Sequence, residues 1–464
     1  MKRDRNPNTR KREDELVGRY ENFVKGGGLG YFEVEELETI INHYMDGANT
    51  EEAMNAVRYG RELHPNNTTL LAKQARLYAD TGKTQEALAI IDYIQTIDST
   101  DEDASLLKGE IFLRKGLVDE AMSIFKKMDG EADNDDYCTF LNIAYALNDN
   151  RLYDDAIRYL DKAVAIAPNN TDILFELAFS MEQKQEFDKA IDTYNHILDQ
   201  TPYSNEAWFN IGQLYFYQEQ YDKAIDAFDY AYAITPNDYQ SLLQKANALF
   251  LCNRFREAAD AYEEYADLTG EASNTFVLTG ECYEKMSDFA NAETLYRKAI
   301  DLDGNNIDAL SGLCACCIEL EKPEEALHYI ETALRISPNN SDLWVQKAEA
   351  LIYLERQKDA IECFNHALTL NPSQVDALVS LGNLYVDDGE YDIALHYYQQ
   401  AQMIQSDING MPLLLAIVFY KKGDYPMCIK NLRESSASDP QTFKAFYEIC
   451  PEAMDDIRLK NIDF

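Results

Sequence analysis

Apolar residues recur along this chain at the spacing of amphipathic helices, in pairs of helical segments. Within residues 205–238, Trp208 and Tyr215 fall on one face of a first predicted helix. A second apolar set begins at Ala224 and keeps the same period of 3.6 residues until Pro236 ends the pattern. The segment therefore predicts a hairpin of two helices. Such a hairpin cannot bury its apolar faces alone, so it must be stacked on neighbours.

The same pattern recurs every 34 residues over residues 34–442, with one step of 35. The units begin at residues 34, 68, 102, 137, 171, 205, 239, 273, 307, 341, 375 and 409. Position 20 of the units is alanine in all but the last, where it is cysteine: Ala53, Ala87, Ala121, Ala156, Ala190, Ala224, Ala258, Ala292, Ala326, Ala360, Ala394 and Cys428. Small residues also dominate position 8, and proline is frequent at position 32. The twelve units are therefore copies of one helix hairpin.

The period and the residues Trp208, Gly212, Ala224 and Pro236 resemble the tetratricopeptide repeat (TPR). We expect an all-α fold, an α-solenoid of antiparallel helix hairpins in which each hairpin contacts mainly its neighbours. The resemblance further implies a right-handed superhelix whose first helices line a concave groove.

The segments outside the repeats predict short terminal elements. Residues 1–12 are basic and predict a flexible arm, and residues 13–33 predict a cap helix followed by a glycine linker. The linker is not a phosphate-binding loop, because no Gly-Lys-Ser/Thr follows it. Residues 443–464 predict capping helices that close the last hairpin.

The charge of the chain disfavours some classes of binding partner. Eighty-two acidic and 42 basic residues give a formal net charge of −40, which disfavours nucleic acid and anionic membranes. Some of this acidity has a structural explanation, because many carboxylates stand at the starts of second helices and favour the helix dipole there. No apolar run suits a membrane span or a signal peptide, so we expect a cytoplasmic protein.

Residues that could carry chemistry do not form a recognisable site. Cys314, Cys316 and Cys317 suggest a metal site, but no second Cys or His pair stands at zinc spacing, so packing is the favoured interpretation. The six histidines lack catalytic partners at a characteristic spacing. We expect no enzyme activity, no cofactor and no metal.

The first helices offer a face that packing within the hairpin does not require. It comprises positions 2, 5, 9, 12 and 13 of each unit. In three central units this face is rich in aromatic residues, and it predicts a partner-binding groove made by Phe175, Phe179, Phe209, Gln213, Phe216, Tyr217, Leu243, Asn247 and Phe250. Further along, the same positions become acidic: Glu281, Glu284, Asp308, Glu319, Asp342, Glu349, Asp376 and Asp387. The aromatic residues could instead fill a tight superhelix, and both interpretations stay open.

These observations predict a non-enzymatic scaffold that binds a protein or peptide with apolar anchors and basic flanks. Chaperone-binding members of the family hold a C-terminal carboxylate with a clamp of Lys, Arg and Asn residues. No consecutive units carry this clamp; the relevant sets are Glu38, Asn42, Lys73, Asp103 and Leu107, or Phe175, Phe179, Asn210, Gln240 and Gln244. Two alternatives are a regulatory receptor whose superhelix changes pitch on ligand binding and a non-catalytic subunit of an enzyme complex.

Overall fold

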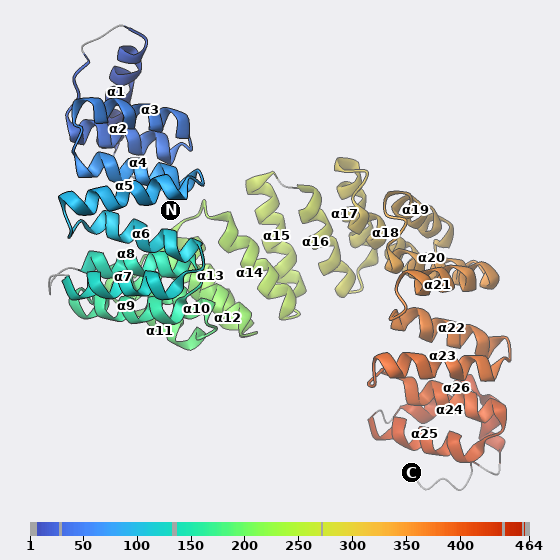
Figure 1. Cartoon of the computed structure of the whole chain (residues 1–464). Helices are drawn as coiled ribbons and strands as arrows, with labels where there is room; N and C mark the ends of the chain where they lie inside the picture. The colour runs from blue at the N-terminus through green and yellow to red at the C-terminus, as the bar shows by residue number, and fades with distance from the viewer. Residues whose placement is uncertain are drawn as a thin grey trace. The chain divides into compact units, whose positions relative to one another are not determined.

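The computed structural model describes residues 7–26, 30–131, 137–270, 272–438, 441–456 and 459. These residues form 26 α-helices and one short 3-10 helix, without a strand. Successive helices pack as antiparallel pairs, such as α8 with α9 and α16 with α17 (Figure 1). The predicted fold class, an α-solenoid of helix hairpins, is thereby confirmed.

The helices follow the repeat register. The first helices of the twelve repeats are α2 (Val34–Asp46), α4 (Thr68–Asp80), α6 (Glu102–Arg114), α8 (Tyr137–Asp149), α10 (Thr171–Gln183), α12 (Asn205–Tyr217), α14 (Tyr239–Leu251), α16 (Ala272–Lys285), α18 (Ile307–Glu319), α20 (Ser341–Tyr353), α22 (Val375–Asp387) and α24 (Met411–Lys422). The second helices are α3 (Thr50–Leu63), α5 (Thr84–Ile97), α7 (Val118–Glu131), α9 (Tyr153–Ile166), α11 (Phe187–Gln200), α13 (Tyr221–Ile234), α15 (Phe255–Thr269), α17 (Phe289–Leu302), α19 (Pro323–Ile336), α21 (Gln357–Leu370), α23 (Tyr391–Ile404) and α25 (Tyr425–Ser438).

The chain divides into two compact units, residues 1–214 and residues 215–464. The boundary falls inside α12, which carries part of the predicted groove.

Helix starts are fixed by capping residues in the loops between repeats. The side chains of Asn67, Asn170 and Asn306, at position 34, accept hydrogen bonds from backbone N–H groups of the next first helix at 3.0–3.2 Å. In the first two of these repeats, a proline two residues earlier prevents the second helix from continuing. The Trp344 indole donates a 2.8 Å hydrogen bond to the Pro338 carbonyl and holds this loop against the next helix.

The core of each repeat depends on small residues where the helices approach one another. All twelve residues at position 20 are fully buried. At position 8 the approach is closer still: a Cβ atom on Gly280 would lie 2.8 Å from Cε1 of Tyr296. Larger side chains at these positions would overpack a core that is already filled.

The turn inside every hairpin has the same left-handed residue. At position 15 of all twelve repeats the backbone has a positive φ, and only four of these residues are glycine: Gly82, Gly116, Gly389 and Gly423. The other eight are Ala48, Arg151, Gln185, Glu219, Asn253, Ser287, Glu321 and Glu355, with φ between 57° and 61°. The turn therefore keeps its conformation although most residues there are not glycine.

Both ends of the repeat array carry additional helices. At the N-terminal end, α1 (Pro7–Val24) begins six residues before the expected cap helix, because proline is well tolerated in the first turn of a helix. Its residue Tyr20 is buried against Phe32, with ring centroids 5.7 Å apart. Residues 1–6 of the expected flexible arm lie outside the described residues. At the C-terminal end, α26 (Thr442–Ile449) buries Phe446, and the 3-10 helix Pro451–Asp455 follows.

Candidate functional site

In the first unit, the predicted groove residues lie on α10 and α12 and are partly packed. These residues are Phe175, Phe179, Phe209 and Gln213. The ring of Phe175 lies 5.8 Å from the buried ring of Tyr194, and Phe179, 40% exposed, lies 6.5 Å from the ring of Tyr153. Phe209 and Gln213 are half-buried. This part of the face therefore combines packed rings with accessible aromatic surface.

In the second unit, the predicted residues lie at the end of α12 and on α14. They are Phe216, Tyr217, Leu243, Asn247 and Phe250. Phe216 and Phe250 pack edge-on against the first residue of the following helix, Tyr221 or Phe255, at 5.5 and 5.4 Å. Tyr217 is 69% exposed, and Leu251, at the same repeat position on α14, is 46% exposed. Position 12 thus closes the hairpin, whereas position 13 presents apolar surface to the solvent.

Buried tyrosines reach this face from the second helices. At position 24, the Tyr194 hydroxyl donates to Glu182 Oε1 at 2.5 Å and accepts from Asn210 Nδ2 at 3.0 Å. The hydroxyl of Tyr262 donates to Asn247 Oδ1 at 2.7 Å. Two further tyrosines at this position make the same kind of bond, Tyr296 to Glu284 at 3.0 Å and Tyr398 to Asn383 at 2.6 Å. These bonds hold polar side chains of the first helices in fixed orientations, which the hydrophobic period alone does not predict.

Three ion pairs join neighbouring repeats on this face in the first unit. They are Lys73 with Glu38 at 3.9 Å, Arg76 with Glu110 through two hydrogen bonds, and Arg114 with Asp80 at 3.0 Å. Each basic side chain bridges two first helices. Glu35 and Asp103, at position 2, are exposed and form no ion pair with a described residue, so this portion of the face remains acidic although much of its charge is paired.

Four acidic residues of this face in the second unit lack such compensation. Glu281, Asp308, Glu349 and Asp376 form no ion pair with any described residue of that unit. Burial, together with the nearby charges of Glu284 and Asp308, raises the pKa of Glu281. Burial and the charge of Asp376 likewise raise the pKa of Glu349. The carboxylates therefore repel one another, and a cationic ligand would relieve that repulsion.

Family models describe the same repeats. Models of the tetratricopeptide repeat match residues 147–210, 205–238, 243–307, 285–344, 341–374 and 375–408. These matches cover residues 147–238 and 243–408, more than half of the chain. The chain belongs to the tetratricopeptide repeat family. TPR arrays provide extended surfaces for protein–protein interaction, and proteins of the family are in general adaptors rather than catalysts.

Solved structures resemble parts of this chain at low sequence identity. YrrB, described as a TPR protein with an unusual peptide-binding site, is 18% identical over 40% of this chain and 95% of its own, with a TM-score of 0.34. MamA is 17% identical over 37% of this chain and 93% of its own, with a TM-score of 0.34. PilF of Pseudomonas aeruginosa is 17% identical over 46% of this chain and 97% of its own, with a TM-score of 0.40. No curated protein matches the chain.

One group of side chains in the TPR array has metal-ligand spacing. Single ligand atoms of Glu293, Cys317 and Glu325 lie within 4.8 Å of one another. However, Lys322 Nζ lies 3.0 Å from both carboxylate oxygens of Glu293, and an Arg297 nitrogen lies 2.7 Å from one of them. Two cations thus already neutralise the buried carboxylate, and the group is better described as an ion-pair network between α17 and α19.

The remaining candidates for chemistry are buried thiols. Cys314, Cys316 and Cys317 are fully buried in α18. Burial raises the pKa of Cys314 to about 12 and that of Cys317 to about 11, so these thiols stay protonated at neutral pH. Among the described residues, no helix has both the length and the apolar character needed to cross a membrane.

Proposed function

We propose that this TPR protein is an interaction scaffold whose first-helix face binds a polypeptide segment with apolar anchors and lysine or arginine flanks. The observation that carries the proposal is the loss of ion pairing along the face. Glu38, Asp80 and Glu110 pair with basic residues of neighbouring repeats on α2, α4 and α6, whereas Glu281, Asp308, Glu349 and Asp376 on α16, α18, α20 and α22 form no ion pair with a described residue. A basic segment gains the most where carboxylates are partly desolvated and repel one another.

Exposed apolar side chains in the second unit supply the anchors. Tyr217 and Leu251 stand on successive first helices at the same repeat position. Aromatic residues with polar surroundings are the usual energetic centres of interfaces. An apolar side chain of the partner would lie against them, and its basic residues would extend toward Glu281 and Glu349.

The proposal is tested with a defined peptide and substitutions of the face. The probe is a labelled peptide of alternating leucine and lysine, and its binding is followed by fluorescence anisotropy at several salt concentrations. The double variant Tyr217→Ser/Leu251→Ser should bind at least tenfold more weakly. Glu281→Gln/Glu349→Gln should weaken binding and also reduce its salt dependence, because fewer charges are then paired on binding.

The matched control removes apolar side chains elsewhere that are at least as exposed as Tyr217 and Leu251. Tyr203, 84% exposed in the loop before α12, and Met403, at the end of α23, are replaced by serine. This variant should bind like the parent protein. Equal binding by the face variant and the parent would contradict the apolar anchors. An unchanged salt dependence in the glutamine variant would contradict the acidic contribution.

A stability measurement separates binding from packing at the half-buried residues. Phe209→Ser and Phe216→Ser should lower the melting temperature, because both rings are partly buried. Tyr217→Ser should leave it nearly unchanged. If Tyr217→Ser destabilises the protein as strongly as Phe216→Ser, position 13 belongs to the core and not to a binding surface.

A further inference from the structure

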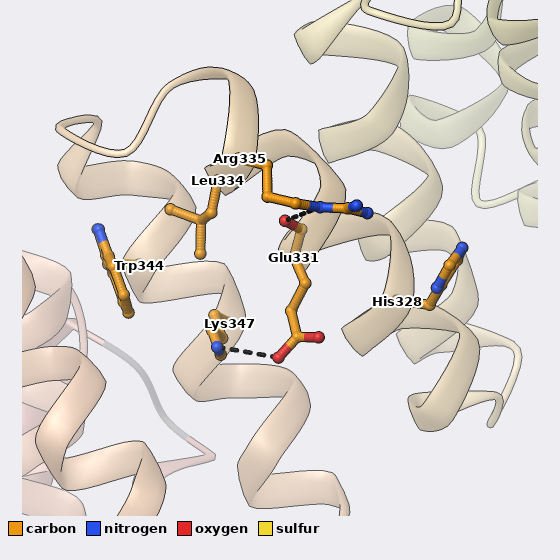
Figure 2. A pocket seen from close by; sticks show the side chains of 6 residues that line it. All are labelled: His328, Glu331, Leu334, Arg335, Trp344 and Lys347. Atoms are coloured by element: carbon orange, nitrogen blue, oxygen red, sulfur yellow. Dashed lines mark hydrogen bonds and ion pairs between the residues drawn. The ribbon is translucent and has the colours of Figure 1, made fainter.

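A cleft of different chemistry lies on another face of the second unit. Its volume is about 330 Å³, and it lies between α19 and α20 (Figure 2). His328, Glu331, Leu334, Arg335, Trp344 and Lys347 line it. A second cavity of about 430 Å³ shares Glu331, Trp344 and Lys347 with it. On α20, Trp344 and Lys347 occupy positions 4 and 7, about 150° around the helix from the first-helix face.

The cleft holds more positive charge than its carboxylate can neutralise. Lys347 Nζ lies 3.0 Å from a carboxylate oxygen of Glu331, so that pair is compensated. Arg335 bonds only within its own helix in the contacts described, to the Glu331 carbonyl at 3.4 Å and to Thr332 Oγ1 at 2.8 Å. In Figure 2 the guanidinium and the ammonium approach Glu331 from opposite ends. The charge of Arg335 is therefore available to an anion.

The floor of the cleft is a rigid aromatic surface. The Trp344 indole is fixed by its hydrogen bond to Pro338, and the imidazole of His366 lies 4.3 Å from it, edge to face. Lys347 Nζ lies 5.5 Å from the centre of the indole. An apolar side chain could therefore lie on the indole beside a cationic group without reorganising the site.

The repeat that contains Trp208 can be compared with this cleft. Trp208 has the same repeat position as Trp344 and the same bond to a preceding proline, Pro202, at 3.1 Å. The positions equivalent to His328, Arg335 and Lys347 are there occupied by Asp192, Asp199 and Ile211. Aspartates thus stand in place of His328 and Arg335, and an isoleucine stands in place of Lys347. The positive charge is therefore a feature of the cleft around Trp344 and does not accompany the equivalent tryptophan, Trp208.

We propose that the cleft between α19 and α20 docks an acidic peptide segment. A carboxylate of the segment binds the Arg335 guanidinium while Lys347 stays paired with Glu331, and a neighbouring apolar side chain lies against Trp344. Guanidinium groups suit this role because they bind carboxylates through two parallel hydrogen bonds. At physiological salt the screening length is about 8 Å, so remote negative charges of the chain are screened. Asp359 and Glu362 line the adjoining cavity, so the acidic segment lies at the Arg335 end of the cleft. The scaffold would then hold a basic partner on one face and an acidic partner on another.

The chain has only two tryptophans, which allows each site to be observed separately. The variant Trp208→Phe keeps only Trp344, and Trp344→Phe keeps only Trp208. The probe is a blocked hexapeptide of alternating glutamate and leucine. It should change the fluorescence of the Trp208→Phe protein in a saturable manner and leave that of the Trp344→Phe protein unchanged. A response of equal size in both proteins would refute the site.

Charge variants in the Trp208→Phe background test the residues. Arg335→Glu should weaken peptide binding at least tenfold, and Arg335→Gln should weaken it less. Lys347→Gln should also weaken binding, whereas Lys245→Gln should not, although Lys245 makes the equivalent ion pair with Asp229 at 2.5 Å. Circular dichroism checks that the variants remain folded. Unchanged affinity in Arg335→Glu would overturn the proposal. If inorganic phosphate alone produced the same response at the same concentration, the cleft would be a free-anion site and the peptide assignment would be wrong.

Discussion

The buried tyrosines at position 24 allow a stability prediction with graded magnitudes. Removing the hydroxyl of Tyr262 breaks one hydrogen bond, to Asn247, and should cost about 1 kcal/mol. Removing that of Tyr194 breaks two, one of them to the Glu182 carboxylate, and should cost about 2 to 3 kcal/mol. The ring itself fits in both cases, because Phe364 occupies the equivalent position and is fully buried. Tyrosine-to-phenylalanine variants therefore isolate the contribution of the hydroxyl.

The measurement must be local, because repeat arrays need not unfold as a single unit. Native-state hydrogen exchange followed by mass spectrometry reports α10 and α11 for Tyr194→Phe, and α14 and α15 for Tyr262→Phe. The control is Tyr353→Phe, since Tyr353 is an exposed side chain and should show no change. The reasoning would be refuted if Tyr194→Phe were no more destabilising than Tyr262→Phe, or if both matched the control.

Three further predictions concern charge, thiols and packing. The folded-state pKa of Glu281 and of Glu349 lies above the unfolded value, so ionisation of these side chains destabilises the fold as pH rises. Glutamine at either site should therefore raise the melting temperature at pH 7. This gain should vanish near pH 4, where the carboxyl groups are protonated. A thiol reagent at pH 8 should react fastest with the exposed Cys138, and with Cys314 only after unfolding, which peptide mapping of the labelled protein would show. Ala394→Leu should destabilise α22 and α23 by about 2 to 3 kcal/mol, measurable by hydrogen exchange, because Ala394 is fully buried and a larger side chain overpacks the site.

Much of the fold could be predicted because the same packing pattern recurs in all twelve repeats. The alanines at position 20 indicated close contact between helices, and every one of them is buried. The face was harder to interpret. Phe216 packs against Tyr221 and is also partly exposed. The hydrophobic period places a residue on a helix face, but it does not tell how much of its side chain is buried.

The sequence also carries a signal for two further features. Arg76 and Glu110 are 34 residues apart, as are Asp80 and Arg114, so the period itself brings these opposite charges together on neighbouring helices. Glycines recur at position 15 in four repeats and mark the left-handed turn. The bonds of the position 24 tyrosines could not be predicted, because their partners vary between glutamate and asparagine and between positions of the first helix.

The left-handed turns also allow the stability of each hairpin to be changed separately. A residue other than glycine in this conformation costs roughly 1 kcal/mol, and eight of the twelve hairpins carry such a residue. Substitutions in well-separated repeats act almost independently, so exchanges such as Glu321→Gly would tighten single hairpins without touching any binding face. The stability of a single hairpin can thus change through its turn while the first-helix face proposed to bind a partner stays the same.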